Sequence, residues 1–168
     1  KLDNFSDRVL VFTQTNLLVV NVSTLREEFL EETHRWKGIS SPNHAVHTTF
    51  GVVWANEFSV YKYDGDSVVD LMMNQTGDFE GNRNIARSAW SSFFASNSLV
   101  IYEPNKNQII IKRGTLGTSD QNNGDVYIFD LDTESWSFGK NRFVTTSGVD
   151  SPKDTNTITL KDGSVYMI

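Results

Sequence analysis

Histidine and cysteine, the commonest protein ligands of zinc, are scarce in this sequence. The chain of 168 residues contains three histidines, His34, His44 and His47, and no cysteine. Without cysteine it can form no disulfide and no thiolate metal site. His44 and His47 are three residues apart, so an extended strand would direct them to opposite faces and make them a poor ligand pair. We therefore expect neither a bound metal nor another cofactor.

Carboxylates are more abundant, and two groups of them lie in short polar segments: Asp64 with Asp66, and Asp130 with Asp132 and Glu134. A glycosidase needs two carboxyl groups facing one bond, about 5–10 Å apart. Aspartate at the tip of a hairpin has a simpler role, because its side chain accepts hydrogen bonds from the backbone of the turn. The sequence contains no phosphate-binding loop and no nucleophile elbow. We therefore predict that these acids form turns and that the protein is not an enzyme.

Three aromatic residues on predicted hairpins, Tyr61, Tyr127 and Trp136, are the remaining candidates for a binding site. Exposed rings of this kind could stack on sugars. Aromatic residues of strands more often pack between sheets, with any polar tip reaching a hydrogen-bond partner. Packing is the favoured interpretation of all three residues, and glycan stacking is the alternative.

Composition narrows the classes of function. Hydrophobic residues make up 38% of the chain, charged residues 21% and aromatic residues 12%, as expected of a folded domain. The net charge of −6 argues against a surface that grips nucleic acid, because such surfaces are basic. An acidic wall instead suits a surface past which DNA moves without binding. The sequence has no signal peptide and no apolar run of about 18 residues, so we expect no membrane partner.

The secondary structure that carries these candidate residues is predicted most clearly over residues 49–72. They contain three strand-like runs: Gly51–Ala55, residues 58–63 and residues 67–72. The runs are separated by reversals at Asn56-Glu57 and at Asp64-Gly65. Asp-Gly between apolar residues is a strong hairpin signal, because glycine tolerates positive φ and aspartate bonds its own backbone. The stretch is predicted to be a three-stranded antiparallel meander.

Further strands are predicted on both sides of this meander. They cover residues 8–12, 17–22, 44–48, 98–102, 108–113, 125–130, 135–138, 157–160 and 164–167. In the first two of these strands the candidate core residues are Val9, Val11, Leu17 and Val19. The alternation of apolar and polar residues and the turn-forming segments between runs indicate antiparallel pairing of neighbours.

Two segments interrupt the strands. In residues 23–36, Thr24 and Glu27 have the spacing of a capping box, and Leu25 and Phe29 are separated by a helical interval. This segment is predicted to be a short helix or an irregular crossover. Residues 84–97 are predicted to contain a second short helix.

A weak repeat runs through the strands. Residues 60–64, 99–103 and 126–130 each end in an aromatic residue followed by an acid, and a turn and a second strand come next. Repeated antiparallel hairpins of this kind are typical of β-propeller blades. We predict an all-β fold in which hairpins and meanders form propeller-like blades, with one or two short helices. Residues 1–168 are expected to form a single domain, and the chain, which starts at Lys1 without methionine, to be a fragment of a longer polypeptide.

Several motifs carry a resemblance to a known family. They are, in chain order, Lys37-Gly38-Ile39, Ser41-Pro42-Asn43, Phe50-Gly51-Val52-Val53-Trp54-Ala55-Asn56, Tyr63-Asp64-Gly65, Trp90-Ser91-Ser92-Phe93, Ile101-Tyr102-Glu103-Pro104, Val126-Tyr127-Ile128-Phe129-Asp130 and Ser135-Trp136. With these motifs, residues 8–138 resemble the tail nozzle or tail tubular proteins of short-tailed bacteriophages. Ser59 departs from the pattern, which has glycine there.

The resemblance implies a structural virion protein without catalytic site or cofactor, assembled in the host cytoplasm. Six copies would form a ring at the distal end of the genome-ejection channel. Its partners would be further copies of itself, the portal and adaptor proteins and the tail fibres, and DNA would pass without specific binding. The alternative function is that of a carbohydrate-binding propeller, an adhesin for host-surface glycans that uses Tyr61, Tyr127 or Trp136.

Overall fold

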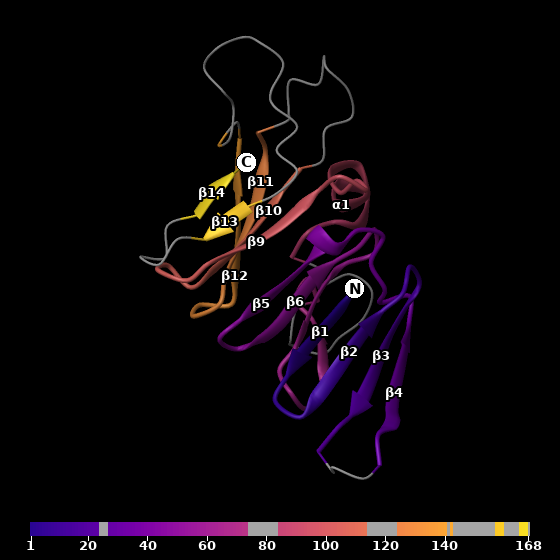
Figure 1. The fold of residues 1–168 in the computed structure, drawn as a ribbon. Helices are drawn as coiled ribbons and strands as arrows, with labels where there is room; N and C mark the ends of the chain where they lie inside the picture. Colours follow the sequence, from indigo (N-terminus) through magenta and orange to yellow (C-terminus); the bar gives the residue numbers. More distant parts are fainter. Residues whose placement is uncertain are drawn as a thin grey trace. The chain divides into compact units, whose positions relative to one another are not determined.

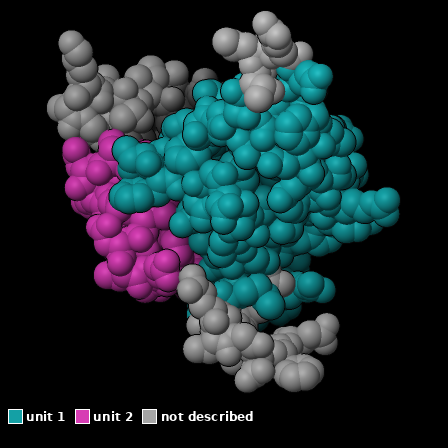
Figure 2. All heavy atoms as spheres, turned by 90° about the horizontal axis from the view of Figure 1, so that it is seen from below, with its two compact units in different colours: residues 1–91 teal, residues 92–168 magenta. Residues whose placement is uncertain are grey.

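The computed structural model consists mainly of antiparallel strands (Figure 1). It describes residues 1–23, 27–73, 84–113, 124–140 and 142, together with the backbone of residues 157–159 and 165–167. The chain forms two compact units, residues 1–91 and residues 92–168 (Figure 2). The all-β prediction is confirmed. A single domain over residues 1–168 stays a prediction.

The first sheet contains strands β1 (Leu2–Phe5), β2 (Arg8–Phe12), β3 (Asn16–Asn21) and β4 (Phe29–Arg35), in the order β1-β2-β3-β4. The pairing of β2 with β3 was predicted, whereas β1 was not. The prediction of a helix or irregular crossover over residues 23–36 is wrong for β4, which pairs along β3. Ladder hydrogen bonds to a neighbouring strand outweigh the local helical spacing, because propensity is a weak prior against tertiary pairing.

The core face of this sheet differs from the prediction in one strand. Leu17 and Val19 are buried as predicted, but Leu10 and Phe12 are buried in place of Val9 and Val11. The turn after β2 sets Phe12 opposite Leu17 and Leu10 opposite Val19. Residues directly opposite each other in an antiparallel pair share a face. Val9 and Val11 therefore cannot lie on the face that carries Leu17 and Val19.

The second sheet contains β5 (Ala45–Thr48), β6 (Gly51–Ala55), β7 (Val60–Tyr63) and β8 (Val68–Asp70), in that order. It follows a 3-10 turn, η1 (Pro42–His44). The predicted meander is confirmed, and every residue of β6 is buried. Gly51 begins β6 at φ +131°, and a Cβ atom there would lie 2.0 Å from the carbonyl oxygen of Tyr63. Only glycine fits this close approach of two backbones.

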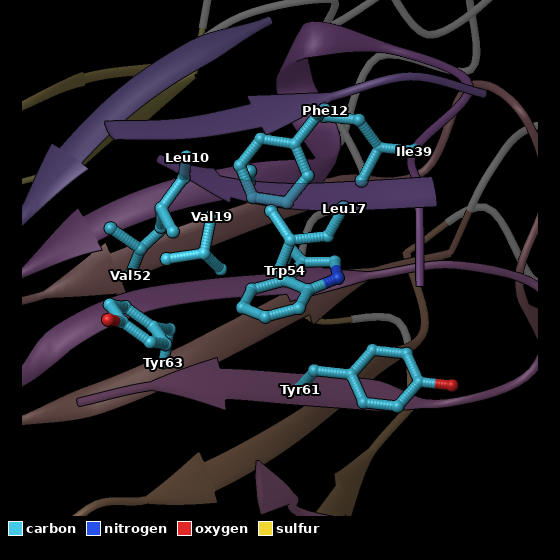
Figure 3. Packing of buried hydrophobic residues seen from close by; sticks show 10 residues of the cluster. Leu10, Phe12, Leu17, Val19, Ile39, Val52, Trp54, Tyr61 and Tyr63 are labelled. Carbon is cyan, nitrogen blue, oxygen red and sulfur yellow. The ribbon is translucent and has the colours of Figure 1, made fainter. Parts of the chain in front are cut away.

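The two sheets of the first unit share a hydrophobic core (Figure 3). Leu10, Phe12, Leu17 and Val19 come from the first sheet, and Val52, Trp54, Tyr61 and Tyr63 come from the second. Trp54 is completely buried, with ring centroids 5.3 Å from Phe12 and 5.6 Å from Tyr61. Side chains of both sheets therefore meet around one indole.

The second unit contains β9 (Leu99–Glu103), β10 (Gln108–Lys112), β11 (Val126–Asp130) and β12 (Ser135–Gly139), in the order β12-β11-β10-β9. Both of its predicted hairpins are confirmed. The strands β13 (Thr157–Thr159) and β14 (Val165–Met167) also pair as predicted. Helix α1 (Arg87–Phe93) lies within the predicted helical segment 84–97. The described part of the chain thus contains three meanders of four strands, each built from consecutive strands.

Candidate functional site

The three histidines lie on different elements, His34 on β4, His44 in η1 and His47 on β5. His44 is completely buried in η1, with Nδ1 3.4 Å from Ser40 Oγ. His47 on β5 is half exposed, and its Nδ1 atom is 3.4 Å from a carboxylate oxygen of Asp3 on β1. Among the residues that the structure describes, no three histidine, aspartate or glutamate side chains are grouped to hold a metal ion.

The predicted acidic turns are confirmed at both hairpins. Asp64 Oδ1 accepts hydrogen bonds from the amides of Asp66 and Ser67, at 3.1 and 3.0 Å. Asp130 Oδ1 accepts them from the amides of Asp132 and Thr133, at 3.1 and 2.9 Å. Such turn-capping carboxylates hold the backbone reversal that follows their strand.

The pKa shifts of these two acids agree with turn formation. Partial burial acts to raise the pKa of Asp64, but the amides of Ser67 and Asp66 outweigh it and leave that pKa below its usual value. The side chain of Gln108 and the amide of Thr133 likewise lower the pKa of Asp130. A general acid of a glycosidase needs a raised pKa, so neither carboxyl group is suited to that role.

The three candidate stacking residues are divided between the units. Tyr61 is only 6% exposed, and the ammonium of Lys37 lies 5.3 Å from its ring centroid. Tyr61 therefore packs in the core and presents no open ring face to a sugar. Tyr127 and Trp136 lie on the paired strands β11 and β12 of the second unit and are partly buried.

Tyr127 and Trp136 belong to an aromatic cluster on one face of the second unit. Tyr127 has its ring 4.7 Å from that of Phe93 and 4.9 Å from that of Phe138. Trp136 lies edge-on to Tyr127 at 6.3 Å and 4.9 Å from Phe129. These rings contact one another, as expected of the packing interpretation.

Five residues of the motifs named in the sequence analysis, Lys37, Gly38, Trp54, Asn56 and Trp90, meet in one hydrogen-bonded region of the first unit. We use the term Asn56 joint for Trp36, Lys37, Gly38, Trp54, Asn56 and Trp90. Trp54 Nε1 donates a hydrogen bond to the carbonyl oxygen of Lys37 at 2.9 Å. Trp90 Nε1 donates one to the carbonyl oxygen of Asn56, also at 2.9 Å. Both indoles are completely buried, so each needs such a partner for its N–H group.

The side chain of Asn56 connects two loops. Its Nδ2 atom donates to the carbonyl oxygens of Trp36 and Gly38, at 2.9 and 3.1 Å. Its Oδ1 atom accepts from the amides of Phe58 and Ser59, at 2.9 and 3.2 Å. One carboxamide therefore satisfies four backbone groups, two in the loop after β4 and two in the turn between β6 and β7.

The loop after β4 is also held by the first sheet. Gly38 N donates to Thr15 O at 3.3 Å, and Ile39 N donates to Thr13 O at 2.9 Å. A Cβ atom on Gly38 would lie 2.4 Å from Thr13 O. The loop is thus fixed between the turn of one sheet and the turn of the other.

Two exposed aromatic rings lie next to this joint. Trp36 is 63% exposed and Phe58 is 37% exposed. Their ring centroids are 6.2 Å apart, with an interplanar angle of 79°. Trp36 adopts φ +63°, a left-handed conformation that is a genuine outlier for a bulky residue. Trp36 thus combines an exposed side chain with a left-handed backbone conformation.

Lys37 adds a charged group beside the joint. Desolvation lowers its pKa, while the charges of Asp70 and Glu32 act in the opposite direction. Asp70 Oδ1 also accepts hydrogen bonds from Ser59 Oγ and from the amide of Met72. Ser59 is buried, and its hydroxyl therefore has a structural use at the position where glycine was expected.

Sequence reasoning missed the joint and the exposed pair, although it singled out several of their residues. Asn56 was identified only as part of a reversal, and the segment containing Trp36 was predicted to be helical or irregular. The available signal was an asparagine directly after an apolar strand, because such a side chain often bonds backbone groups two and three residues ahead. Nothing in the sequence indicated that Asn56 also reaches a loop about 20 residues away in the chain.

No helix in the described ranges is both long and apolar enough to cross a membrane.

Comparison with known proteins identifies no family. Neither a protein-family model nor a curated protein matches this chain.

Proposed function

We propose that this protein is a structural component of a bacteriophage tail, a nozzle-like subunit that assembles into a ring around the distal genome-ejection channel. The proposal rests on the resemblance of residues 8–138 to that family. The observation that most strongly supports the proposal is that residues of these motifs have structural roles in the first unit. Gly38, Trp54, Asn56 and Trp90 hold two four-stranded sheets and their loops together.

The repeated four-stranded meanders support the same proposal. Propeller blades are four-stranded antiparallel sheets arranged around a channel, and the three meanders described here have that strand order. The net charge of −6 also fits a wall past which DNA moves, since like charge discourages adhesion to phosphates. The partners would be further copies of this chain, the portal and adaptor proteins and the tail fibres.

The test is native mass spectrometry and negative-stain microscopy of the protein with and without a portal–adaptor complex. A six-fold ring docked at the end of the adaptor is the expected result. A protein that stays monomeric and does not bind the portal–adaptor complex would overturn the proposal. Trp54→Ala serves as a control for non-specific adhesion, because loss of the buried indole should abolish ordered docking without changing the net charge.

A further inference from the structure

The outer edge of β12 in the second unit is open to a further strand. In the sheet order β12-β11-β10-β9 this strand has β11 as its one neighbour. Among the residues that the structure describes, no strand pairs along its other side. An edge strand presents a row of backbone N–H and C=O groups, which can pair with a strand of another molecule.

The hydrogen bonds of this sheet show in which direction each residue of β11 bonds. Arg113 N donates to Asp125 O at 2.9 Å, at one end of the β10–β11 ladder. Leu131 N donates to Asn107 O at 3.0 Å, at the other end. Opposed residues of an antiparallel pair alternate between bonded and non-bonded. The odd-numbered residues of β11 therefore bond β10, and its even-numbered residues bond β12.

The backbone of Phe138 consequently faces outward. The residues of β12 opposite the even-numbered residues of β11 are Ser135, Ser137 and Gly139. Phe138 lies between two of them, so its N–H and C=O groups point away from β11. Its side chain is 48% exposed, and Ser137 beside it is exposed as well. Phe138 therefore offers both a backbone pair and a ring at this edge.

The other edges of the four-stranded sheets carry residues that discourage pairing. Each of these five edge strands contains an acid or a histidine, namely Asp3 in β1, Glu31 in β4, His47 in β5, Asp70 in β8 and Glu103 in β9. The pairing of β4 also contains a register shift. Charges and bulges are features by which proteins block edge pairing. The strand β12 has no charged residue, no proline and no register shift.

The sequence of β12 suits a second copy of the same strand. In antiparallel pairing about a two-fold axis at Phe138, the N–H group of each Phe138 donates to the C=O group of the other. Opposed residues share a face, so the two rings would meet on the face that carries Tyr127. Aromatic pairs in this position stabilise a sheet, whereas like charges would oppose pairing. No charge of one β12 strand would face a charge of the other.

We infer that two copies of this chain pair through β12, which joins their four-stranded sheets into one continuous sheet. A two-fold contact uses the same surface on both copies and closes at two. It cannot by itself build a six-fold ring. The dimer therefore concerns the protein free of the portal–adaptor complex, and the inference does not depend on the proposed function.

The first test is sedimentation velocity of the full chain over a range of concentrations, and a monomer–dimer equilibrium is expected. Phe138→Lys sets two like charges opposite each other across the axis, so dimerisation should weaken at least about tenfold. Phe138→Pro removes an N–H group that does not bond β11 and should weaken it as well. Leu30→Lys is the matched control, because Leu30 is a 56% exposed apolar residue of the edge strand β4. Thermal midpoints verify that all variants fold.

Single cysteines give a second test, because the chain has no cysteine of its own. Bonded opposed residues have Cα atoms about 5.5 Å apart, within the range of a disulfide. Phe138→Cys should therefore form a covalent dimer on mild oxidation, and Leu30→Cys should form little.

Three results would overturn the inference. They are a wild type that is monomeric at all concentrations, a dimer unaffected by both Phe138→Lys and Phe138→Pro, and equal cross-linking of Phe138→Cys and Leu30→Cys. Docking of the same variants to the portal–adaptor complex is measured separately. Failure of the dimer is therefore distinguishable from failure of the proposed function.

Discussion

Two segments with nearly the same sequence have different surroundings in the two units. Residues 60–64 read Val-Tyr-Lys-Tyr-Asp and residues 126–130 read Val-Tyr-Ile-Phe-Asp. Both form a strand that ends at an aspartate turn, and the second aromatic residue of each is buried. The first aromatic residue differs, because Tyr61 lies in the core shared by two sheets whereas Tyr127 stays partly exposed. A local repeat therefore determines the turn, and the packing partners determine the burial.

The largest difference between the two units in the free energy of unfolding is expected when the tryptophan nearest each segment is replaced. Trp54→Ala removes a completely buried indole between two sheets, and such truncations cost about 3–5 kcal/mol. Trp136 is partly exposed on the edge strand β12, so Trp136→Ala should cost clearly less. Urea unfolding of both variants measures the two changes. Equal losses would mean that the two aromatic clusters contribute alike.

Replacing a glycine should also change the free energy of unfolding to different extents in the two units, at Gly51 of β6 and at Gly139 of β12. Gly51→Ala places a methyl group 2.0 Å from a backbone oxygen at φ +131°, and we expect a loss of more than about 2 kcal/mol. At Gly139 the nearest atoms belong to side chains, Cγ of Arg142 at 2.8 Å and Cγ2 of the buried Val126 at 3.1 Å, and not to the backbone. Gly139→Ala should therefore cost less than Gly51→Ala. The thermal midpoints of the two variants provide the comparison, and a reversed order would contradict it.

Asn56→Ala tests the Asn56 joint of the first unit. The substitution leaves two carbonyl oxygens and two amides without their partner, at an expected cost of about 2–3 kcal/mol. Asn56→Asp keeps the acceptor for the two amides but sets a carboxylate oxygen against the carbonyl oxygens of Trp36 and Gly38 at a buried position, so its cost should be at least that of Asn56→Ala. Chemical denaturation of the three proteins gives the order. Wild-type stability in Asn56→Ala would show that water replaces the carboxamide.

The aspartate turns should behave alike in both units, with the smallest effects. The folded-state pKa of Asp64 and of Asp130 lies below the usual value, so each ionised group stabilises the fold above pH of about 4. That contribution is lost as the pH falls through the folded-state pKa. Asp64→Asn and Asp130→Asn should therefore reduce the loss of stability as the pH falls below about 4. Measuring urea midpoints across this range checks the effect, and a pH dependence unchanged in both variants would contradict it.

The hairpins were the most predictable part of the fold, because turn chemistry is local. Asp64-Gly65 and Asp130 hold their own reversals through bonds to residues two and three positions ahead. The strand β4 was not predictable in this way, since its partner β3 supplies ladder bonds that no spacing within residues 23–36 reveals. Its first residues, Phe29 and Leu30, are both exposed, which gives no alternation to detect.

The candidate site was less predictable than the fold. For Tyr61 the sequence favoured packing over glycan stacking, and its burial in the core shared by the two sheets confirms packing. Trp36 carried no motif, and its exposure depends on a loop fixed from two sides by distant residues. Long-range contacts of this kind follow from packing and not from any window of sequence.

The hydrogen bonds of Asn56 have a consequence for how such proteins could diverge. All four partners of its carboxamide are backbone atoms, so the network does not require any particular side chain at position 36 or 58. Substitutions at these two positions can accumulate while asparagine and the neighbouring Gly38 stay fixed. The side chains that these two loops expose can therefore change while the hydrogen bonds that fix the loops stay the same.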